Sequence, residues 1–110
     1  MTMKAAEFLD TTHPLLADRV RLAIMASVAA ATEAMEFSVL LDTLSLSKGN
    51  LSAHCQKLEQ AGLLEIRKAF VGRKPRTTYL CTEFGRSEVS KYLSQVEQLL
   101  KQASGGAEHV

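Results

Sequence analysis

The periodicity of apolar residues changes twice in the second half of the chain, and this change most limits the folds that the sequence can adopt. Leu51, Cys55 and Leu58 are spaced by four and then three residues, as in a helix, and Gly62 can end that helix in the left-handed conformation. From Gly62 to Cys81 apolar and polar residues alternate instead, which is typical of strands. Helical spacing then returns. The sequence therefore predicts a mainly α-helical chain with one β-hairpin, an α+β fold.

The hairpin is predicted to turn over residues 71–76, between two runs of alternating residues. Arg73, Lys74 and Arg76 lie within four residues of one another around Pro75, which restricts the backbone of the tip. Such a cationic tip suits phosphates or a narrow minor groove. Charged residues at hairpin tips also serve solubility alone, so a merely solvated tip is the alternative.

Helices are predicted at the start of the chain as well. A short one covers residues 3–10, where apolar residues have helical spacing. A longer one begins at Pro14, in the first helical position, and continues to Ala31. Apolar residues occupy most of the circumference of this second helix, so it must be covered on two sides. One of those sides can meet another subunit.

The middle of the chain predicts a helix-turn-helix. A short helix ending near Leu44 is followed, after a break of about three residues, by the helix over residues 48–61. Ser38 and Ser47 stand at the starts of these helices, where a serine side chain can cap free N–H groups. Thr82 has the same relation to a last helix, whose apolar residues step by three and four.

The net charge of +1 conceals an uneven distribution of charged residues. Residues 1–43 hold three basic and six acidic groups, residues 44–79 hold seven and two, and residues 80–110 hold three and four. The three segments therefore carry −3, +5 and −1. Because affinity for a polyanion depends on charge clustered on one surface, the near-neutral net charge is only weak evidence against nucleic-acid binding.

What the sequence lacks argues against several other classes. The longest apolar stretch, near residues 22–31, is interrupted by Ser27 and is too short to cross a membrane, so we expect a cytoplasmic protein. Cys55 and Cys81 lie singly in apolar patterns, which predicts free, buried thiols. The three histidines are far apart, and no nucleophile motif or phosphate loop is present. We therefore expect neither an enzyme, nor a metal site, nor a cofactor.

Two strings carry a resemblance to a known family. Residues 46–64, LSKGNLSAHCQKLEQAGLL, resemble the recognition helix of MarR-like and ArsR-like repressors. Residues 72–86, GRKPRTTYLCTEFGR, resemble the wing and following helix of small stand-alone winged-helix regulators. The resemblance covers about four-fifths of the chain and implies a winged helix-turn-helix that regulates transcription, with no enzymatic activity. The thiolate metal motif of many ArsR-like sensors would fall near residues 39–44, where the chain has no such ligand.

The resemblance implies a sequence-specific regulator that binds double-stranded DNA as a homodimer. The recognition helix, residues 48–61, would enter the major groove, and a basic wing, residues 71–77, would contact the backbone or minor groove. The predicted DNA-binding residues are Ser47, Lys48, Asn50, Ser52, Ala53, Gln56, Lys57, Arg73, Lys74, Arg76 and Thr77. Asn50 and Gln56 have the paired donor and acceptor that suit adenine. Each polar residue of a helix can also be simply solvated, which is the alternative for any one of them.

We expect a single domain over residues 1–110, with a DNA-binding core at 14–82, a dimerisation helix at 83–103 and a flexible tail at 104–110. The predicted dimer interface is apolar: Leu15, Leu22, Val89, Tyr92, Leu93, Val96, Leu99 and Leu100. Packing of the last helix within its own chain is the alternative. A rival function is a winged helix that serves as a protein-interaction module in a larger assembly. A small-molecule effector is compatible with the resemblance, but no residue pattern supports one.

Overall fold

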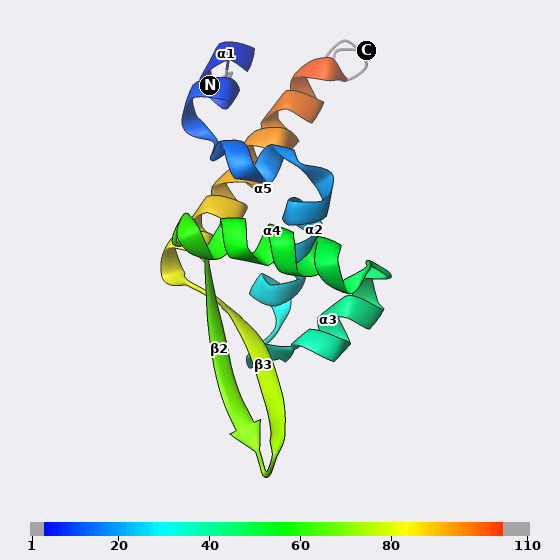
Figure 1. Cartoon of the computed structure of the whole chain (residues 1–110). Coiled ribbons are helices and arrows are strands. Elements are labelled where there is room, and N and C mark those ends of the chain that lie inside the picture. The colour runs from blue at the N-terminus through cyan, green and yellow to red at the C-terminus, as the bar shows by residue number, and fades with distance from the viewer. Residues whose placement is uncertain (1–3, 105–110) are drawn as a thin grey trace.

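The structure, a computed structural model, describes residues 4–104, which form six helices and a small sheet (Figure 1). Their order is α1 (Ala5–Thr11), a 3-10 helix η1 (Pro14–Ala17), α2 (Arg19–Ala30), β1 (Met35–Glu36), α3 (Phe37–Leu44), α4 (Lys48–Gln60), β2 (Leu64–Val71), β3 (Lys74–Cys81) and α5 (Glu83–Ala103). The predicted fold, mainly helical with a β-hairpin and a long last helix, is confirmed.

The three strands form an antiparallel sheet in the order β1-β3-β2. In the long hairpin, Leu64 pairs with Cys81 and Val71 with Lys74. The turn is therefore only Gly72 and Arg73, and the prediction of a turn over residues 71–76 was too long. Gly72 has a φ of +65°, which a glycine adopts without steric cost and which a two-residue hairpin turn requires.

The predicted helix from Pro14 to Ala31 is interrupted, and this prediction was wrong in one respect. Asp18 is extended, and its carboxylate accepts hydrogen bonds from the backbone N–H groups of Val20 (2.8 Å) and Arg21 (3.0 Å). An aspartate that caps a helix in this way starts a new one. The result is the separate pair η1 and α2.

The start of α3 also differs from the prediction. It begins at Phe37 after Glu36, and no side chain caps it, so Ser38 is not its cap. The reason is tertiary: Met35 and Glu36 pair with Tyr79 and Thr78 of β3, which fixes the backbone just before the helix. A two-residue strand has too little sequence pattern to be predicted.

The first helix, predicted over residues 3–10, is observed over Ala5–Thr11, and residue 3 lies outside the described residues. The predicted ends of α4 and the predicted start of α5 are confirmed. The Ser47 hydroxyl accepts a hydrogen bond from the N–H of Asn50 (3.2 Å), and Thr82 accepts one from Gly85 (2.9 Å). Gly62 has a φ of +78° at the end of α4. Gly85 is needed for close packing, since a Cβ there would lie 2.0 Å from the carbonyl oxygen of Leu63.

The core lies where α2, α3, α4, the sheet and the first half of α5 meet. It consists of Leu16, Ile24, Met25, Val28, Leu40, Leu51, Cys55, Leu58, Leu63, Leu64, Tyr79, Cys81 and Val89. The predicted stripe on α4 is fully buried. Two parts extend away from this core at opposite ends, the hairpin at one end and α1 with the second half of α5 at the other (Figure 1).

Candidate nucleic-acid interface

Helix α4 presents one polar face to solvent. Because Leu51, Cys55 and Leu58 are buried and residues are ~100° apart around a helix, the opposite face must carry the residues between them. We call this the reading face: Gly49, Asn50, Ala53, Gln56, Lys57 and Gln60, all of which are exposed. Its side chains are small, amide or cationic, so the face combines close approach with hydrogen-bonding capacity.

Helix α4 and the hairpin border a common cleft of about 470 Å³. Ser52 and Gln56 line it from α4, and Lys68 and Thr77 line it from β2 and β3. Lys68 and Thr77 are cross-strand neighbours. The predicted site residues Ser52 and Thr77 are therefore half-buried groups facing this cleft, while Gln56 belongs to both the cleft and the reading face.

The cations of the hairpin differ in how they are neutralised. The Arg76 guanidinium pairs with the Glu36 carboxylate at 2.5 Å, and Arg67 pairs with Glu65. Lys68, Arg73 and Lys74 have no carboxylate partner among residues 4–104. Of the three predicted wing cations, Arg73 and Lys74 therefore remain without a carboxylate partner, whereas Arg76 has one.

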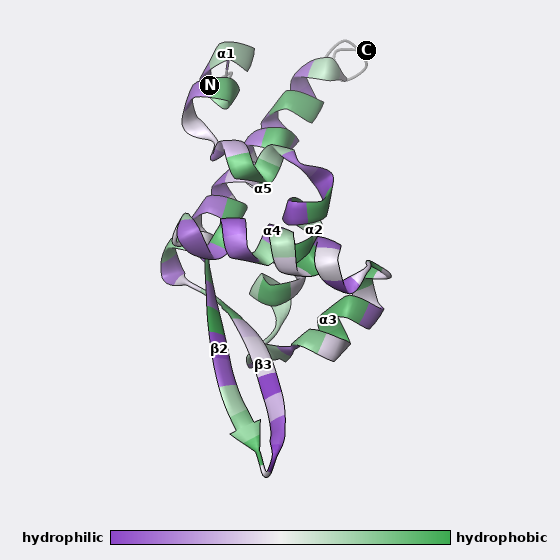
Figure 2. Ribbon diagram, in the orientation of Figure 1, coloured by the Kyte–Doolittle hydropathy of each residue, from purple (hydrophilic) through white to green (hydrophobic). Residues whose placement is uncertain are grey.

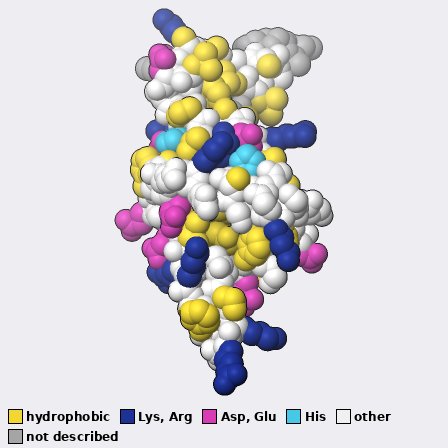
Figure 3. All heavy atoms as spheres, viewed as in Figure 1, with side chains coloured by type: hydrophobic (Ala, Val, Ile, Leu, Met, Phe, Trp, Pro, Cys, Tyr) yellow, Lys and Arg dark blue, Asp and Glu magenta, His cyan; other side chains and the backbone are white. Residues whose placement is uncertain are grey.

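The remaining predicted DNA-binding residues cluster at the start and middle of α4. Ser47 is occupied as the cap of this helix but stays exposed, next to the exposed Lys48. Lys57 stands on the far side of the reading face from Ser52. The space-filling view in Figure 3 shows Lys and Arg side chains on the hairpin and beside α4.

Two residues beside the reading face were not among the predicted site residues. The Arg21 Nη1 lies 3.3 Å from Nδ1 of His54 in α4, and its Nε donates to the carbonyl of Leu15 at 2.8 Å. These contacts hold a guanidinium against the edge of the helix. The backbone N–H of Arg21, bonded to Asp18, also lowers the pKa of that carboxyl. No sequence spacing links Arg21 to His54, which are 33 residues apart, so only the fold joins them.

Lys68 was missed for another reason. In the alternation of the first strand, Lys68 falls on the same face as the apolar residues Leu64 and Ile66. Lys68 does lie on that face of the strand, but it is not buried. The hairpin leaves the core after Ile66, so Lys68 is exposed. The presence of a lysine at an otherwise apolar position of the strand was the sequence signal that this face of the hairpin becomes solvent-exposed.

The two thiols lie inside the core. Burial raises the pKa of Cys55 to about 12 and also raises the pKa of Cys81. A thiol with a raised pKa stays protonated at neutral pH and is a poor nucleophile. Burial also raises the pKa of Tyr79 to about 12. No group of three His, Cys, Asp or Glu residues in 4–104 is arranged to hold a metal ion, and no helix in that range is long and apolar enough to cross a membrane.

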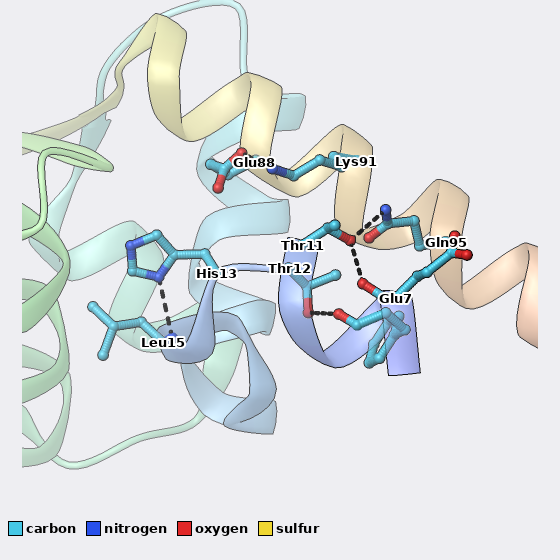
Figure 4. Close-up of polar contacts among 9 residues, drawn as sticks. Glu7, Thr11, Thr12, His13, Leu15, Glu88, Lys91 and Gln95 are labelled. Carbon is cyan, nitrogen blue, oxygen red and sulfur yellow. Dashed lines mark hydrogen bonds and ion pairs between the residues drawn. The ribbon is translucent and has the colours of Figure 1, made fainter. Parts of the chain in front are cut away.

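At the opposite end, α1 packs on α5. The rings of Phe8 and Tyr92 are 5.4 Å apart. Gln95 Nε2 donates to the Thr11 hydroxyl at 2.8 Å (Figure 4). One side of α5 is covered in this way. The predicted interface residue Tyr92 is therefore half-buried within its own chain.

A second side of α5 carries a stripe of apolar residues that runs off the core. Val89 is 5% exposed in the core, so its prediction as a dimer contact is corrected to a core position. Leu93, Val96 and Leu100 continue the same side of the helix and are 48%, 37% and 67% exposed. We call these three residues the distal stripe.

The other predicted interface residues are less accessible. Leu15 and Leu22 pack against the core and are half-buried, and Leu99 is half-buried on the last turns of α5. Part of the predicted tail, residues 105–110, lies outside the described residues.

Comparisons with known proteins agree with this architecture. A family model described as a winged helix DNA-binding domain matches residues 20–100. An uncharacterized protein of Methanocaldococcus jannaschii is 35% identical over 69 residues, which are 63% of this chain and 75% of that protein. A transcriptional regulator homologue from Pyrococcus horikoshii OT3 is 31% identical with a TM-score of 0.79, covering 89% of this chain and 94% of that chain.

The fold is also similar to that of a MarR-like transcription regulator from Bacillus cereus ATCC 10987. The identity is 17% and the TM-score 0.65, covering 80% of this chain and 62% of that chain. This likeness concerns the fold alone, and it is the fold that the sequence strings predicted.

Proposed function

Because the chain belongs to the winged helix DNA-binding domain family, a family of regulators rather than enzymes, we propose that it binds specific duplex sequences as a homodimer. In this proposal α4 enters the major groove, and the β2–β3 hairpin lies along the neighbouring backbone or minor groove. The observation that carries the proposal is the shared cleft, in which Gln56 of the reading face and Glu59 of α4 lie across from Lys68 of the hairpin.

The reading face supports the major-groove assignment through its chemistry. The amides of Asn50 and Gln56 can each donate and accept to an adenine edge. Gly49 and Ala53 have little or no side chain, so the helix can approach the base pairs closely. We assign Lys48, Lys57 and the hydroxyl of Ser47 to phosphates, which orient the helix without reading sequence.

The edge of α4 adds cations to this surface. Arg21 is held beside His54 by its bond to the Leu15 carbonyl, and we assign its guanidinium to a phosphate next to the recognition helix. A side chain that is already oriented loses less conformational freedom on binding. His54 positions it.

The hairpin supplies the rest of the backbone contacts. We assign Arg73, Lys74, Lys68 and Thr77 to them. Arg76 contributes less, because the Glu36 carboxylate already neutralises it. The six cations assigned to phosphates in each subunit neutralise about twelve phosphates in a dimer, so the log–log salt slope is expected to be on the order of −11.

Dimerisation is proposed through the distal stripe. Helix α5 extends beyond the core of its own chain, and its exposed apolar row can be buried against the same row of a second copy. Twofold symmetry makes such an interface self-complementary. Pairing at this end would set two recognition helices about one DNA turn, ~34 Å, apart and match an inverted repeat. The homodimer therefore gives a reason for an extended α5.

The test is selection of bound duplexes from a random pool at two salt concentrations. We expect an inverted repeat among the selected sequences and affinity that falls steeply with salt. A variant with Gln56→Ala should lose preference at particular base pairs, whereas Lys57→Ala should weaken binding to all duplexes alike.

Selection of no duplex, together with capture of a heterologous protein by the same chain, would contradict the proposal and favour the protein-interaction module. Selected sequences without symmetry would contradict the homodimer but not DNA binding.

A further inference from the structure

The end of the hairpin carries a large apolar side chain that the fold does not cover. Phe70 is 74% exposed, and every described residue from Arg67 to Arg76 is exposed. An aromatic ring in water loses the stabilisation that burial would give it. Hydropathy colouring shows the outer part of β2 hydrophobic beside a mostly hydrophilic β3 (Figure 2).

The residues around this ring select the kind of partner. Residues 66–82 contain five basic residues and no acidic one. Lysine is depleted at the centres of protein–protein interfaces, where aromatic rings concentrate. Lys68, Arg73 and Lys74 have no carboxylate partner among residues 4–104, whereas Arg67 and Arg76 are paired. A ring beside these three unpaired cations instead fits a surface that is anionic outside and apolar inside, which is the make-up of a nucleic-acid duplex.

The register places the ring toward the duplex. Side chains alternate between the two faces of a strand, so Phe70 shares its face with Lys68 and Ile66. Lys68 and Ile66 line the cleft with Ser52 and Gln56 of α4. Phe70 therefore lies on the face of the hairpin that continues the reading face.

The backbone near the ring is restricted. Phe70 is paired directly with Pro75 across the two strands, and the turn beyond them has only two residues. Proline fixes its own φ, which limits the conformations open to the tip. The ring is thus presented on a short support rather than on a mobile loop.

We propose that Phe70 is an apolar wedge that enters the minor groove beside the site of α4, partly unstacks one base step and kinks the bound DNA. This inference rests on the proposed function and adds a means of indirect sequence readout. Insertion of a phenylalanine between base steps is energetically easiest at flexible pyrimidine–purine steps. The protein therefore selects such a step at a fixed distance from the bases that α4 contacts.

The experiment uses the full chain and a duplex selected from the random pool. Successive adenines outside the α4 half-sites are replaced by 2-aminopurine, whose fluorescence rises when it unstacks, and a dye pair on the duplex ends reports bending. With the unaltered protein we expect a rise at one step beside each half-site, together with shortening of the end-to-end distance.

The substitution Phe70→Ala should abolish the fluorescence rise and the bend and weaken binding about tenfold, because base–aromatic stacking is lost. The salt slope should stay the same, since no phosphate contact is removed. Phe70→Leu should keep part of the bend. The matched control is Val71→Ala, which removes an exposed apolar side chain from the other face and should leave the fluorescence and the bend unchanged.

Binding by the unaltered protein with no unstacked step would overturn the wedge and leave the proposed function in place. So would an unchanged bend in Phe70→Ala. Failure to bind any duplex would overturn both. Self-association that depends on Phe70 in the absence of DNA would instead assign the ring to a contact between copies of the chain, and would also overturn the wedge.

Discussion

The two ends of the molecule expose apolar side chains to a similar extent but in opposite electrostatic surroundings. At the end formed by α1 and α5, the charged groups near the distal stripe are paired on the helix itself, as Lys91 with Glu88 (2.8 Å) and Lys101 with Glu97 (3.6 Å). At the hairpin end, Arg73 and Lys74 have no such partner among residues 4–104. Figure 1 shows both parts extending from one core.

Exposure of apolar side chains alone therefore does not identify a partner. A stripe of aliphatic residues beside self-paired charges is suited to an apolar surface of the same kind, as in a helix seam. A ring among unpaired cations is suited to a polyanion. The charges around an apolar patch therefore decide between a second subunit and DNA. The following substitutions exchange or remove one property at a time.

The largest effect is expected at the distal stripe. The double substitution Leu93→Glu/Leu100→Glu removes two apolar side chains from each subunit of a symmetric dimer and places like charges in the interface. Since burial of one leucine contributes about 1.5–3 kcal/mol, the dissociation constant of the dimer should rise about 100-fold or more. Sedimentation equilibrium measures this, and DNA affinity should fall with it.

The control for that substitution is Val39→Glu on α3, which is also half-exposed but lies outside the distal stripe. It should leave the dimer intact. A Leu93→Glu/Leu100→Glu protein that sediments as a dimer would contradict the assignment of this end to self-association.

The next effect concerns the unpaired cations. Arg73→Ala/Lys74→Ala should weaken binding to all duplexes and reduce the log–log salt slope by about 3.6, which is 0.9 for each of four phosphates in a dimer. Titrations at several salt concentrations give the slope. Lys91→Ala/Lys101→Ala removes the same charge from the opposite end and should leave the slope unaltered. Equal changes in the two variants would show that only net charge matters.

A smaller effect separates folding from binding within α4. Nothing lies within 4 Å of a Cβ built at Gly49, so Gly49→Ala should stabilise the helix by about 0.5–1 kcal/mol. Yet the added methyl group would stand between the reading face and the base pairs, and DNA binding should weaken about tenfold, as overpacking does. Thermal denaturation and DNA titration are read together.

Ser94→Ala is the matched substitution on an exposed part of α5, and it should raise stability without any loss of DNA binding. If Gly49→Ala bound DNA as tightly as the unaltered protein, α4 would not approach the bases at this point.

The smallest effect is expected at the junction of the two parts. The Thr82 hydroxyl accepts from Gly85 in α5 and donates to the carbonyl of Gly62 at the end of α4 (2.7 Å). Thr82→Ala should lower the free energy of unfolding by about 1 kcal/mol, because a capping bond is lost. Thr82→Ser keeps the hydroxyl and should restore stability. A specific loss of DNA binding in Thr82→Ala, at unchanged stability, would mean that this contact orients the two ends.

Local sequence was sufficient for elements whose cause is local. The spacing of Leu51, Cys55 and Leu58 predicted the buried side of α4, and by exclusion its reading face. Ser47 and Gly62 predicted where that helix begins and ends. These predictions succeed because helix periodicity and capping depend on residues within one or two turns of each other.

Predictions that depended on distant parts of the chain failed or were incomplete. Nothing near Glu36 indicates that it pairs with Arg76, 40 residues away, and so weakens one of the three predicted wing cations. Val89 belonged to the same apolar seam as Leu93 and Val96, and only the extent of the core separates a packed residue from exposed ones.

The order of residue types along the chain was enough to predict the helix-turn-helix, the hairpin with its excess of basic residues, and an apolar seam in the last helix. These features follow from composition and periodicity, which a chain carries before it folds. The packed chain was needed to show which cations are left without a carboxylate, where the seam leaves the core, and that Phe70 stands uncovered on the face continuing from α4. The physical reason is that burial and charge pairing are properties of neighbours in space, and those neighbours are set by packing of the whole chain.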